Sequence, residues 1–372
     1  MKTRAAILRS TPGTFEVVDV DLDDEPRDNE VLVQMVAAGL CHSDDHICTG
    51  DMPVEVYPVI GGHEGAGVVQ RVGSGVRHLV PGDHVVFSFM PACGRCRFCA
   101  RGQQNLCRLG ATILTGSRPE DPTSFRVSLD GARVGQYSGL GAFAEHTLVD
   151  ARSCVKVPDD APLDKVCLLG CAVGTGWGSA VNSAGVRVGD TVIVMGVGGI
   201  GVNAVQGAAC AGAGAVIAVD PVPFKREVAS RLGATHAVAT IAEAAELARS
   251  STDGQGADST IVAVGVTTGE HVAEGFASIR KGGTLVVTGI GNVAEHASIP
   301  LWQLTLFQKR IQGSLFGGCS ATVDVPLQVE LYRSGRLRLD ELITTTYTLD
   351  QVAQGYEDMH AGRNIRGVIR FD

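Results

Sequence analysis

Four cysteines lie within fifteen residues, at Cys93, Cys96, Cys99 and Cys107, and their spacing is typical of a metal site. Two-residue gaps bring the first three sulfurs together without strain, and the fourth thiol follows a short loop. Four thiolates fill every position of a tetrahedral zinc ion, so the spacing predicts a structural zinc closed to substrate. Disulfides and an iron–sulfur cluster remain alternatives, although a ferredoxin run ends in C-x3-C-P, whereas here the last gap is seven residues and Arg108 follows.

A glycine-rich motif, GVGGIG, begins at Gly196, directly after an apolar run and before a helix-compatible one. Gly196, Gly198 and Gly201 satisfy G-x-G-x-x-G, whose glycines permit a tight turn, close approach to a pyrophosphate, and helix–strand packing. Asp220 ends the next apolar run, where a carboxylate would accept the ribose hydroxyls and repel a 2′-phosphate. The motif therefore predicts NAD rather than NADP. Lys225 either helps to hold the ribose or is an ordinary solvated helix residue.

A third constellation is dispersed along the chain, at Cys41, His63 and Cys171. Two thiolates and one imidazole would hold a zinc ion with its fourth position free for water or substrate. Spacing alone does not establish such a site, because isolated cysteines and histidines are more often core or surface residues.

Length and composition bound the kind of protein that carries these residues. At 372 residues the chain exceeds the size of one hydrophobic core, so we expect two domains. A net charge of −9 argues against nucleic acid and anionic membranes as partners and favours small molecules. Eleven cysteines without a secretory segment predict a reducing compartment, the cytoplasm. The uncharged stretch 191–219 contains seven glycines, so it is read as a strand, helix and strand rather than a membrane span.

The pattern of elements changes near residue 172. Short β-like runs before it predict a barrel-like domain, and the polar, Gly-rich stretch 109–139 is expected to be a surface excursion. After it, β-like and helix-like runs alternate, which predicts a doubly wound α/β sheet of six strands. The predicted strands are TVIVMG, AVIAVD, HAVAT, STIVAVG, TLVVTG and QGSLFG. The final run, RGVIRF, is expected to return to the first domain. We therefore expect a catalytic domain of residues 1–171 and 316–372 and a nucleotide domain of residues 172–315.

With the cysteine cluster and GVGGIG in this order, the chain closely resembles zinc-dependent medium-chain alcohol dehydrogenases over nearly its full length. The resemblance implies a GroES-like β-barrel catalytic domain around a Rossmann domain. It also implies two zinc ions per chain and reversible oxidation of an alcohol by hydride transfer to NAD. The catalytic zinc would be held by Cys41, His63 and Cys171, and the structural zinc by Cys93, Cys96, Cys99 and Cys107.

The same resemblance assigns roles to residues around the catalytic zinc. Asp44 would fix the tautomer of His63, and Glu64 would lie behind the metal, although both could instead serve local turns. Ser43 would take the alcohol proton and pass it, through the cofactor ribose, to His46 at the surface.

Further residues are implied to contact the cofactor. Thr175 and Ile200 would pack on the nicotinamide, Gly199 belongs to the glycine motif, and Arg366 would grip the pyrophosphate. His42 departs from the pattern, since horse-liver-like enzymes place an arginine there, and a histidine gives weaker, pH-dependent charge.

Substrate-site residues and subgroup are also suggested by resemblance. Phe89 and Tyr137 fall near positions that line the alcohol site, with core packing as the alternative. MPACGRC, GCAVGTGWGSAV and AVDPVPFKRE resemble an actinobacterial subgroup of nicotinoprotein (nitrosodimethylaniline-dependent) alcohol dehydrogenases. Members of that subgroup keep NAD(H) bound and recycle it through an external electron carrier. The family also implies a homodimer or homotetramer.

Two other functions are weighed against alcohol oxidation. A class III-like formaldehyde–thiol dehydrogenase would need cations for the carboxylates of its adduct, for which Arg108, Arg118 and Arg126 are candidates. A non-enzymatic zinc and NAD-binding protein would be expected to lack the catalytic ligands, and this chain keeps them.

Overall fold

The computed structural model describes residues 1–371, which form two compact units. Unit 1 comprises Met1–Cys171, Ser320–Gly335 and Leu339–Asp372, of which Asp372 lies outside the described residues. Unit 2 comprises Ala172–Cys319 and Arg336–Arg338. Residues 316–319 were expected in the first domain, but the structure places them in unit 2. Their backbone packs against helix α3 and against the helical turn 179–184 that follows it, where Asn182 Nδ2 donates to the Gly317 carbonyl at 3.2 Å.

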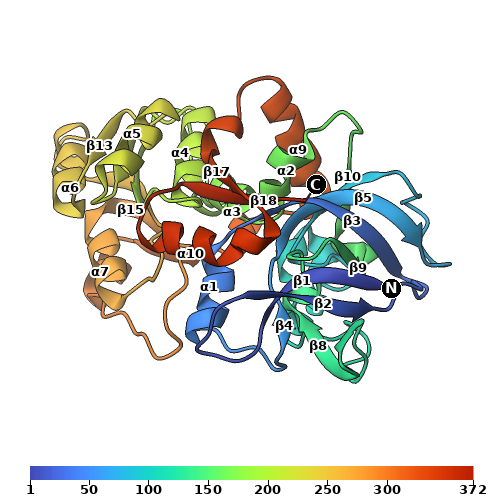
Figure 1. The fold of residues 1–372 in the computed structure, drawn as a ribbon. Helices are drawn as coiled ribbons and strands as arrows, with labels where there is room; N and C mark the ends of the chain where they lie inside the picture. The colour runs from blue at the N-terminus through green and yellow to red at the C-terminus, as the bar shows by residue number, and fades with distance from the viewer. Residues whose placement is uncertain (372) are drawn as a thin grey trace. The chain divides into compact units, whose positions relative to one another are not determined.

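Unit 1 is built mainly of β-structure (Figure 1). Its strands are β1 (Lys2–Leu8), β2 (Glu16–Leu22), β3 (Glu30–Gly39), β4 (Val59–Ile60), β5 (Glu64–Val72), β6 (His84–Phe87), β7 (Val127–Leu129), β8 (Ala132–Gln136), β9 (His146–Asp150), β10 (Cys154–Val157), β17 (Ile343–Tyr347) and β18 (Arg366–Arg370). Its helices are α1 (His42–Thr49), α2 (Leu163–Val166), α9 (Ala321–Arg333) and α10 (Val352–His360).

Two sheets organise these strands. Strands β1-β2-β7-β8-β4 close into a barrel, and a seven-stranded sheet has the order β10-β6-β5-β3-β18-β17, with β9 also paired to β3. The C-terminal strand β18 lies antiparallel to β3, with Ile369 opposite Ala38, so RGVIRF returns to the first domain as predicted (Figure 1). Long β3 pairs with three neighbours, and its mostly buried sequence EVLVQMVAAG explains why it lies in the interior of the sheet.

The expectation for residues 109–139 was wrong in part. Residues 127–136 form the β7–β8 hairpin, which contributes two strands to the closed barrel. The two strands have three and five residues, and burial does not alternate along either of them, so they give no period-2 signal in a polar, Gly-rich context.

Unit 2 contains one parallel sheet of six strands, and so the predicted doubly wound fold is confirmed. The strand order is β13-β12-β11-β14-β15-β16, as in a Rossmann fold. All five residues of β11 are buried, as expected for a central strand covered on both faces. The strands are β11 (Thr191–Met195), β12 (Ala215–Val219), β13 (His236–Val238), β14 (Ala257–Val262), β15 (Ile279–Val287) and β16 (Arg310–Gly313). The helices are α3 (Ala172–Gly178), α4 (Gly201–Cys210), α5 (Pro223–Arg231), α6 (Ile241–Ser250), α7 (Gly269–Ser278) and α8 (Leu301–Leu306).

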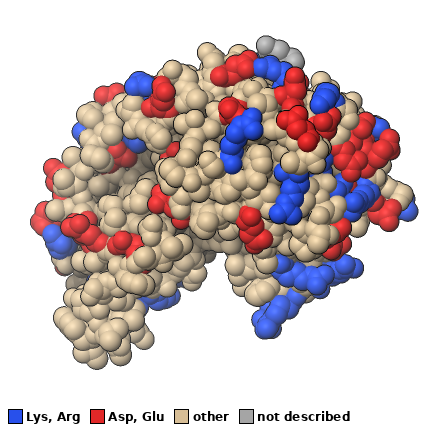
Figure 2. All heavy atoms as spheres, turned by 60° about the horizontal axis from the view of Figure 1, so that its bottom comes forward, with Lys and Arg blue, Asp and Glu red and all other residues tan. Residues whose placement is uncertain are grey.

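The surface carries charges of both signs, as the composition predicts. On the face drawn in Figure 2, acidic and basic side chains lie interspersed among uncharged ones. Within residues 1–371, none of the helices combines the length and apolar character needed to cross a membrane.

Candidate functional site

The three dispersed metal-ligand candidates come together in unit 1. Cys41 immediately precedes α1, His63 immediately precedes β5, and Cys171 follows a short helical turn at 167–170. With Glu64, their ligand atoms all lie within 4.8 Å of one another, and all four residues are buried. Two sulfurs and one imidazole nitrogen form a donor set that fits zinc.

Asp44 fixes the orientation of the His63 ring. The Asp44 carboxylate is fully buried, with Oδ2 2.8 Å from His63 Nδ1, and its Oδ1 accepts the Gly62 N–H at 2.7 Å. Gly62 has φ +88°, and a Cβ there would approach the Phe143 ring to 2.6 Å, so only glycine suits this turn. Because Nδ1 faces Asp44, Nε2 is the nitrogen directed at the thiols, 3.3 Å from Cys171 Sγ.

The electrostatics of this group favour bound positive charge. A hydrogen bond from Cys171, together with the nearby His63, lowers the pKa of Cys41 well below its usual value. Burial raises the pKa of Glu64 to about 7 although the Arg366 guanidinium pairs with it. The negative charge of a buried thiolate beside other acidic groups needs a positive charge to balance it, which a bound cation would supply.

The four-cysteine cluster forms a second group in unit 1, with all sulfurs within 4.8 Å. Gly94 and Gly102 adopt φ of +73° and +75°, which let the chain turn sharply between thiols. Backbone N–H groups point at the sulfurs, and the one from Cys99 is the main cause that lowers the pKa of Cys96 to about 6. All eleven cysteines, which lie within the described residues, are free, so the disulfide alternative is wrong for this structure. Four clustered sulfurs fit a zinc ion with no open position.

Helix α1 also carries the residues predicted to move the proton. Ser43 Oγ lies 3.8 Å from Cys41 Sγ, and His46 is one helical turn further along the same helix. His46 was expected at the surface, but it is only 3% exposed. The helix packs its polar residues inward, where Asp44 pairs with buried His63 and Asp45 pairs with His360 at the surface of α10.

Phe89 and Tyr137 both contact the ring of His63. Their ring centroids lie 6.0 and 5.4 Å from the His63 centroid, in edge-on geometry at 83° and 86°. Tyr137 also belongs to the hydrophobic core of unit 1, and Phe89 packs against that core. The two aromatic side chains therefore combine core packing with a position beside the proposed metal ligand.

The glycine motif in unit 2 has the shape of a phosphate cradle. Gly196 has φ +83°, and a Cβ at Gly201 would lie 1.8 Å from the Gly196 carbonyl oxygen, so both glycines are required by the turn. A Cβ at Gly198 would meet nothing within 4 Å, which leaves open space beside the backbone. Helix α4 begins at Gly201 and directs its free N–H groups toward this turn. The motif therefore fits a dinucleotide pyrophosphate.

Asp220 follows β12 and is held next to the glycine motif. Its Oδ2 accepts the Val197 N–H at 3.1 Å and its Oδ1 accepts the Val222 N–H at 2.9 Å. Arg226, which sequence reasoning missed, donates from Nη1 to the Asp220 and Pro221 carbonyls at 2.7 and 2.9 Å. Its place six residues after Asp220, in the first turns of a helix, was the available signal. These contacts fix the turn that carries the proposed ribose acceptor.

The remaining cofactor candidates occupy different settings. Lys225 is half-buried on α5, Thr175 is buried on α3, and Ile200 lies just before α4. In unit 1, His42 is exposed at the start of α1, whereas Arg366 is buried and pairs with Glu64. Their contacts with a cofactor stay predictions.

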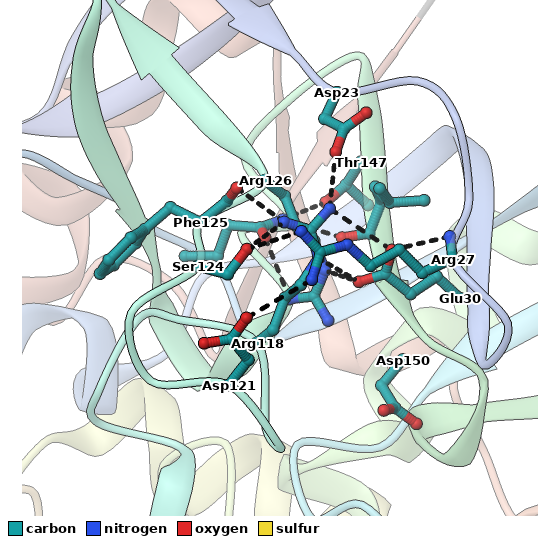
Figure 3. Close-up of polar contacts among 12 residues, drawn as sticks. Asp23, Arg27, Glu30, Arg118, Asp121, Ser124, Phe125, Arg126, Thr147 and Asp150 are labelled. Carbon is teal, nitrogen blue, oxygen red and sulfur yellow. Dashed lines mark hydrogen bonds and ion pairs between the residues drawn. The ribbon is translucent and has the colours of Figure 1, made fainter.

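Arg118 and Arg126 were considered as adduct-binding cations, but they are engaged in a buried network (Figure 3). Both guanidinium groups donate from Nε to Glu30 Oε1, at 2.8 and 2.7 Å, and Arg118 also reaches Asp23. Because both side chains are buried and paired with Glu30, they have a structural role inside unit 1. Of the three candidate arginines, only Arg108 is exposed.

Comparisons with known proteins agree with this geometry. Residues 27–159 match the alcohol dehydrogenase GroES-like domain, and residues 199–330 match the zinc-binding dehydrogenase family. The chain is 51% identical to "Putative alcohol dehydrogenase D" of Mycobacterium tuberculosis, over 99% of this chain and 100% of that one. It is 50% identical to the NDMA-dependent alcohol dehydrogenase of Amycolatopsis methanolica, over 99% of each.

More distant relatives share the whole fold. The S-(hydroxymethyl)glutathione dehydrogenase of Paracoccus denitrificans is 35% identical over both full lengths. The crystal structure of benzyl alcohol dehydrogenase from Acinetobacter calcoaceticus superposes with a TM-score of 0.92 at 28% identity, covering 100% of each chain. Family matches, relatives and site geometry thus agree that the chain belongs to the zinc-dependent medium-chain alcohol dehydrogenases, oxidoreductases that oxidise alcohols.

Proposed function

We propose that Cys41, His63 and Cys171 hold the catalytic zinc of an enzyme that reversibly oxidises an alcohol to an aldehyde or ketone. The observation that carries this proposal is the buried convergence of two sulfurs and the Nε2 side of His63, with Asp44 fixing the ring from behind. Glu64 is the fourth member of the group, but its pairing with Arg366 leaves three ligands and one open position.

When bound, zinc acidifies the alcohol hydroxyl and the nicotinamide of NAD accepts the hydride. Asp44 holds His63 in the tautomer that presents Nε2. Ser43, beside Cys41, accepts the hydroxyl proton and directs it toward His46 on the same face of α1. Phe89 and Tyr137 exclude water from the zinc side of the substrate.

NAD is assigned to unit 2 on the basis of the glycine cradle and Asp220. Gly196, Gly198, Gly199 and Gly201 surround the pyrophosphate, and Asp220 accepts the ribose hydroxyls. Thr175, Ile200, Lys225, Arg366 and His42 are assigned the contacts that the family resemblance implies. Half identity to an NDMA-dependent enzyme supports NAD(H) that stays bound and is reoxidised by an external electron carrier.

We assign a second, structural zinc to Cys93, Cys96, Cys99 and Cys107, which gives two zinc ions per chain. The cluster stabilises the lobe that contacts α9, where Gln104 Nε2 donates to Thr322 at 2.8 Å. Six cysteines must stay reduced to serve both sites, which supports a cytoplasmic location.

A homo-oligomer is proposed through the exposed edge of the unit 2 sheet. Edge strand β16 is exposed along its length, and the neighbouring α8 exposes Leu301, Trp302 and Leu306 by 71, 55 and 74%. An unpaired strand edge beside apolar side chains is typical of a surface covered by another chain. Sedimentation velocity would distinguish the dimer and the tetramer from a monomer.

The proposal is tested by purifying the protein without added nucleotide, desalting it extensively, denaturing it and quantifying released NAD(H) and zinc. Two zinc ions and one NAD(H) per chain would support the nicotinoprotein form. Nucleotide-free protein that oxidises alcohols with added NAD would identify an ordinary dehydrogenase. A zinc-replete protein that oxidises no alcohol with either NAD or an artificial acceptor would refute the proposed function, and activity that requires a small thiol would favour the class III-like reaction.

A further inference from the structure

The proposed proton path was expected to reach the surface at His46, but the structure does not provide an exit there. His46 is 3% exposed, so its ring cannot release a proton directly to bulk water. A buried acid–base group turns over only if a second group connects it to solvent. The structure must therefore supply a neighbour that touches both the His46 ring and water.

Asp51 occupies this position. Helix α1 ends at Thr49, and the φ of +91° at Gly50 reverses the chain. The Gly50 and Met52 N–H groups both donate to the His46 carbonyl at 3.1 Å. The turn returns the Asp51 carboxylate to within 3.4 Å of His46 Nδ1, and the same oxygen accepts the Thr49 hydroxyl at 2.9 Å. The Asp51 side chain is 33% exposed, so one carboxylate contacts both the buried ring and solvent.

The other ionisable groups around α1 have different partners. Asp44 is bound to His63, and Asp45 accepts from His360 of α10 at 2.8 Å. Tyr356 of α10 is buried, and burial raises its pKa well above the usual value, so it stays neutral. Among these groups, only Asp51 lies within hydrogen-bonding distance of the His46 ring.

We propose that Asp51 is the outlet of the proton path, a positioning and proton-accepting residue between His46 and water. The inference rests on the proposed function. One proton enters the His46 ring from the Ser43 side while the Nδ1 proton passes to the Asp51 carboxylate. The carboxylic acid then gives that proton to water, which restores the Asp51 carboxylate and delivers one proton to solvent per alcohol bound. His46 is left as the Nε2–H tautomer and exchanges back to the Nδ1–H tautomer before the next cycle.

The test uses the NAD-loaded enzyme and trifluoroethanol, whose fluorines make its hydroxyl acidic and its hydride hard to remove. Stopped-flow mixing with a pH indicator then follows proton release without turnover. We expect release in Asp51→Asn to be about tenfold slower, less than the ~10²–10⁴ contributed by a group acting in the transition state itself. Added imidazole should restore the rate because a small base can replace the carboxylate, and Asp51→Glu should retain most of it.

Asp45→Asn is the matched control, because it removes a nearby carboxylate of α1 that also pairs with a histidine, His360 of α10. Its release rate should stay within about twofold of the wild type. Wild-type release by Asp51→Asn, or slow release that imidazole does not accelerate, would overturn the role of Asp51 and leave the proposed function intact. If the wild-type holoenzyme takes up trifluoroethanol without releasing a proton, the proposed function fails and the Asp51 proposal fails with it.

Discussion

Glu30 pairs with two buried arginines in unit 1, so a single substitution there tests how much this ion pairing stabilises the fold. Its carboxylate, on β3, accepts from Arg118 and Arg126, and both guanidinium groups are almost fully buried (Figure 3). In Glu30→Gln the side-chain shape is kept but the charge is lost. Arg118 retains the Asp23 carboxylate at 2.7 Å, whereas Arg126 keeps neutral acceptors alone, the amide oxygen at position 30 and Gln136 Oε1 at 3.3 Å. Arg126 would therefore become a buried, unpaired cation.

Removing one partner of a buried ion pair costs about 3–5 kcal/mol, and retention of a neutral acceptor places Glu30→Gln near 3 kcal/mol. Because the chain has two units, we expect unit 1 to lose this stability locally, without one global unfolding transition of the whole chain. Hydrogen–deuterium exchange is the appropriate assay. Peptides from β3 and the β7–β8 hairpin should exchange about 100-fold faster, since each ~1.4 kcal/mol is tenfold, while peptides from β11 and β12 should be unchanged.

Two further variants make this reasoning refutable. Arg126→Met in the Glu30→Gln background removes the orphaned cation and should restore most of the protection, because an apolar replacement of a buried pair is close to neutral. Asp121→Asn breaks the exposed pair with Arg27, at 3.5 Å, and should change protection by less than about 0.5 kcal/mol. The interpretation fails if Glu30→Gln changes exchange less than about fivefold, or if the Arg126→Met double variant is no better protected.

Other predictions concern the metals, the cofactor and acid. Cys171→Ser should abolish most activity with the fold retained, whereas Cys99→Ser should mainly destabilise the protein; full activity with full zinc content in Cys171→Ser would contradict the ligand assignment. Asp220→Ser should weaken NAD binding about 10–100-fold and reduce the preference of the protein for NAD over NADP. Calorimetry on nucleotide-stripped protein would measure both affinities. Burial alone would raise the pKa of Glu30, but Arg126 and Arg118 outweigh it and hold that pKa below its usual value. The stabilisation from Glu30 is therefore present above its ordinary value near 4.3 and lost as pH falls through the lowered one, so the difference between wild type and Glu30→Gln should vanish in acid.

Much of the fold could be predicted because the signals were local. Strand β11 is a continuous apolar run followed by the glycine motif, and five of the six predicted strands of unit 2 were located correctly to within a few residues. The sixth, QGSLFG, is shifted, since β16 ends at Gly313 and residues 316–318 form a turn against α3. The β7–β8 hairpin was missed because its register depends on closure of the barrel with β2 and β4, contacts that are distant in sequence.

The sequence could predict candidate residues for the site, but it could not predict their burial or their partners. Cysteine and histidine types point to a metal wherever they lie, whereas the burial of His46 depends on tertiary packing of α1. Arg118 and Arg126 are candidate cations on the sequence alone, because nothing in the sequence places Glu30, about ninety residues earlier, between them. Charge in a sequence indicates a potential partner, and only the fold decides whether that partner is a ligand or another side chain.

Helix α1 shows why function concentrates in an element that is locally a poor helix. Its sequence HSDDHICT lacks an apolar stripe, yet Asp44, Asp45 and His46 are all buried. Such burial is unfavourable unless each polar group has a partner, and each one does, in His63, His360 and Asp51 respectively. The helix is therefore held by these polar contacts together with the packing of Ile47 and Cys48 in the hydrophobic core of unit 1. Because three of the proposed catalytic residues share its backbone, the contacts of Asp44 with His63 and of His46 with Asp51 stabilise α1 and also align the metal ligand and the proton path.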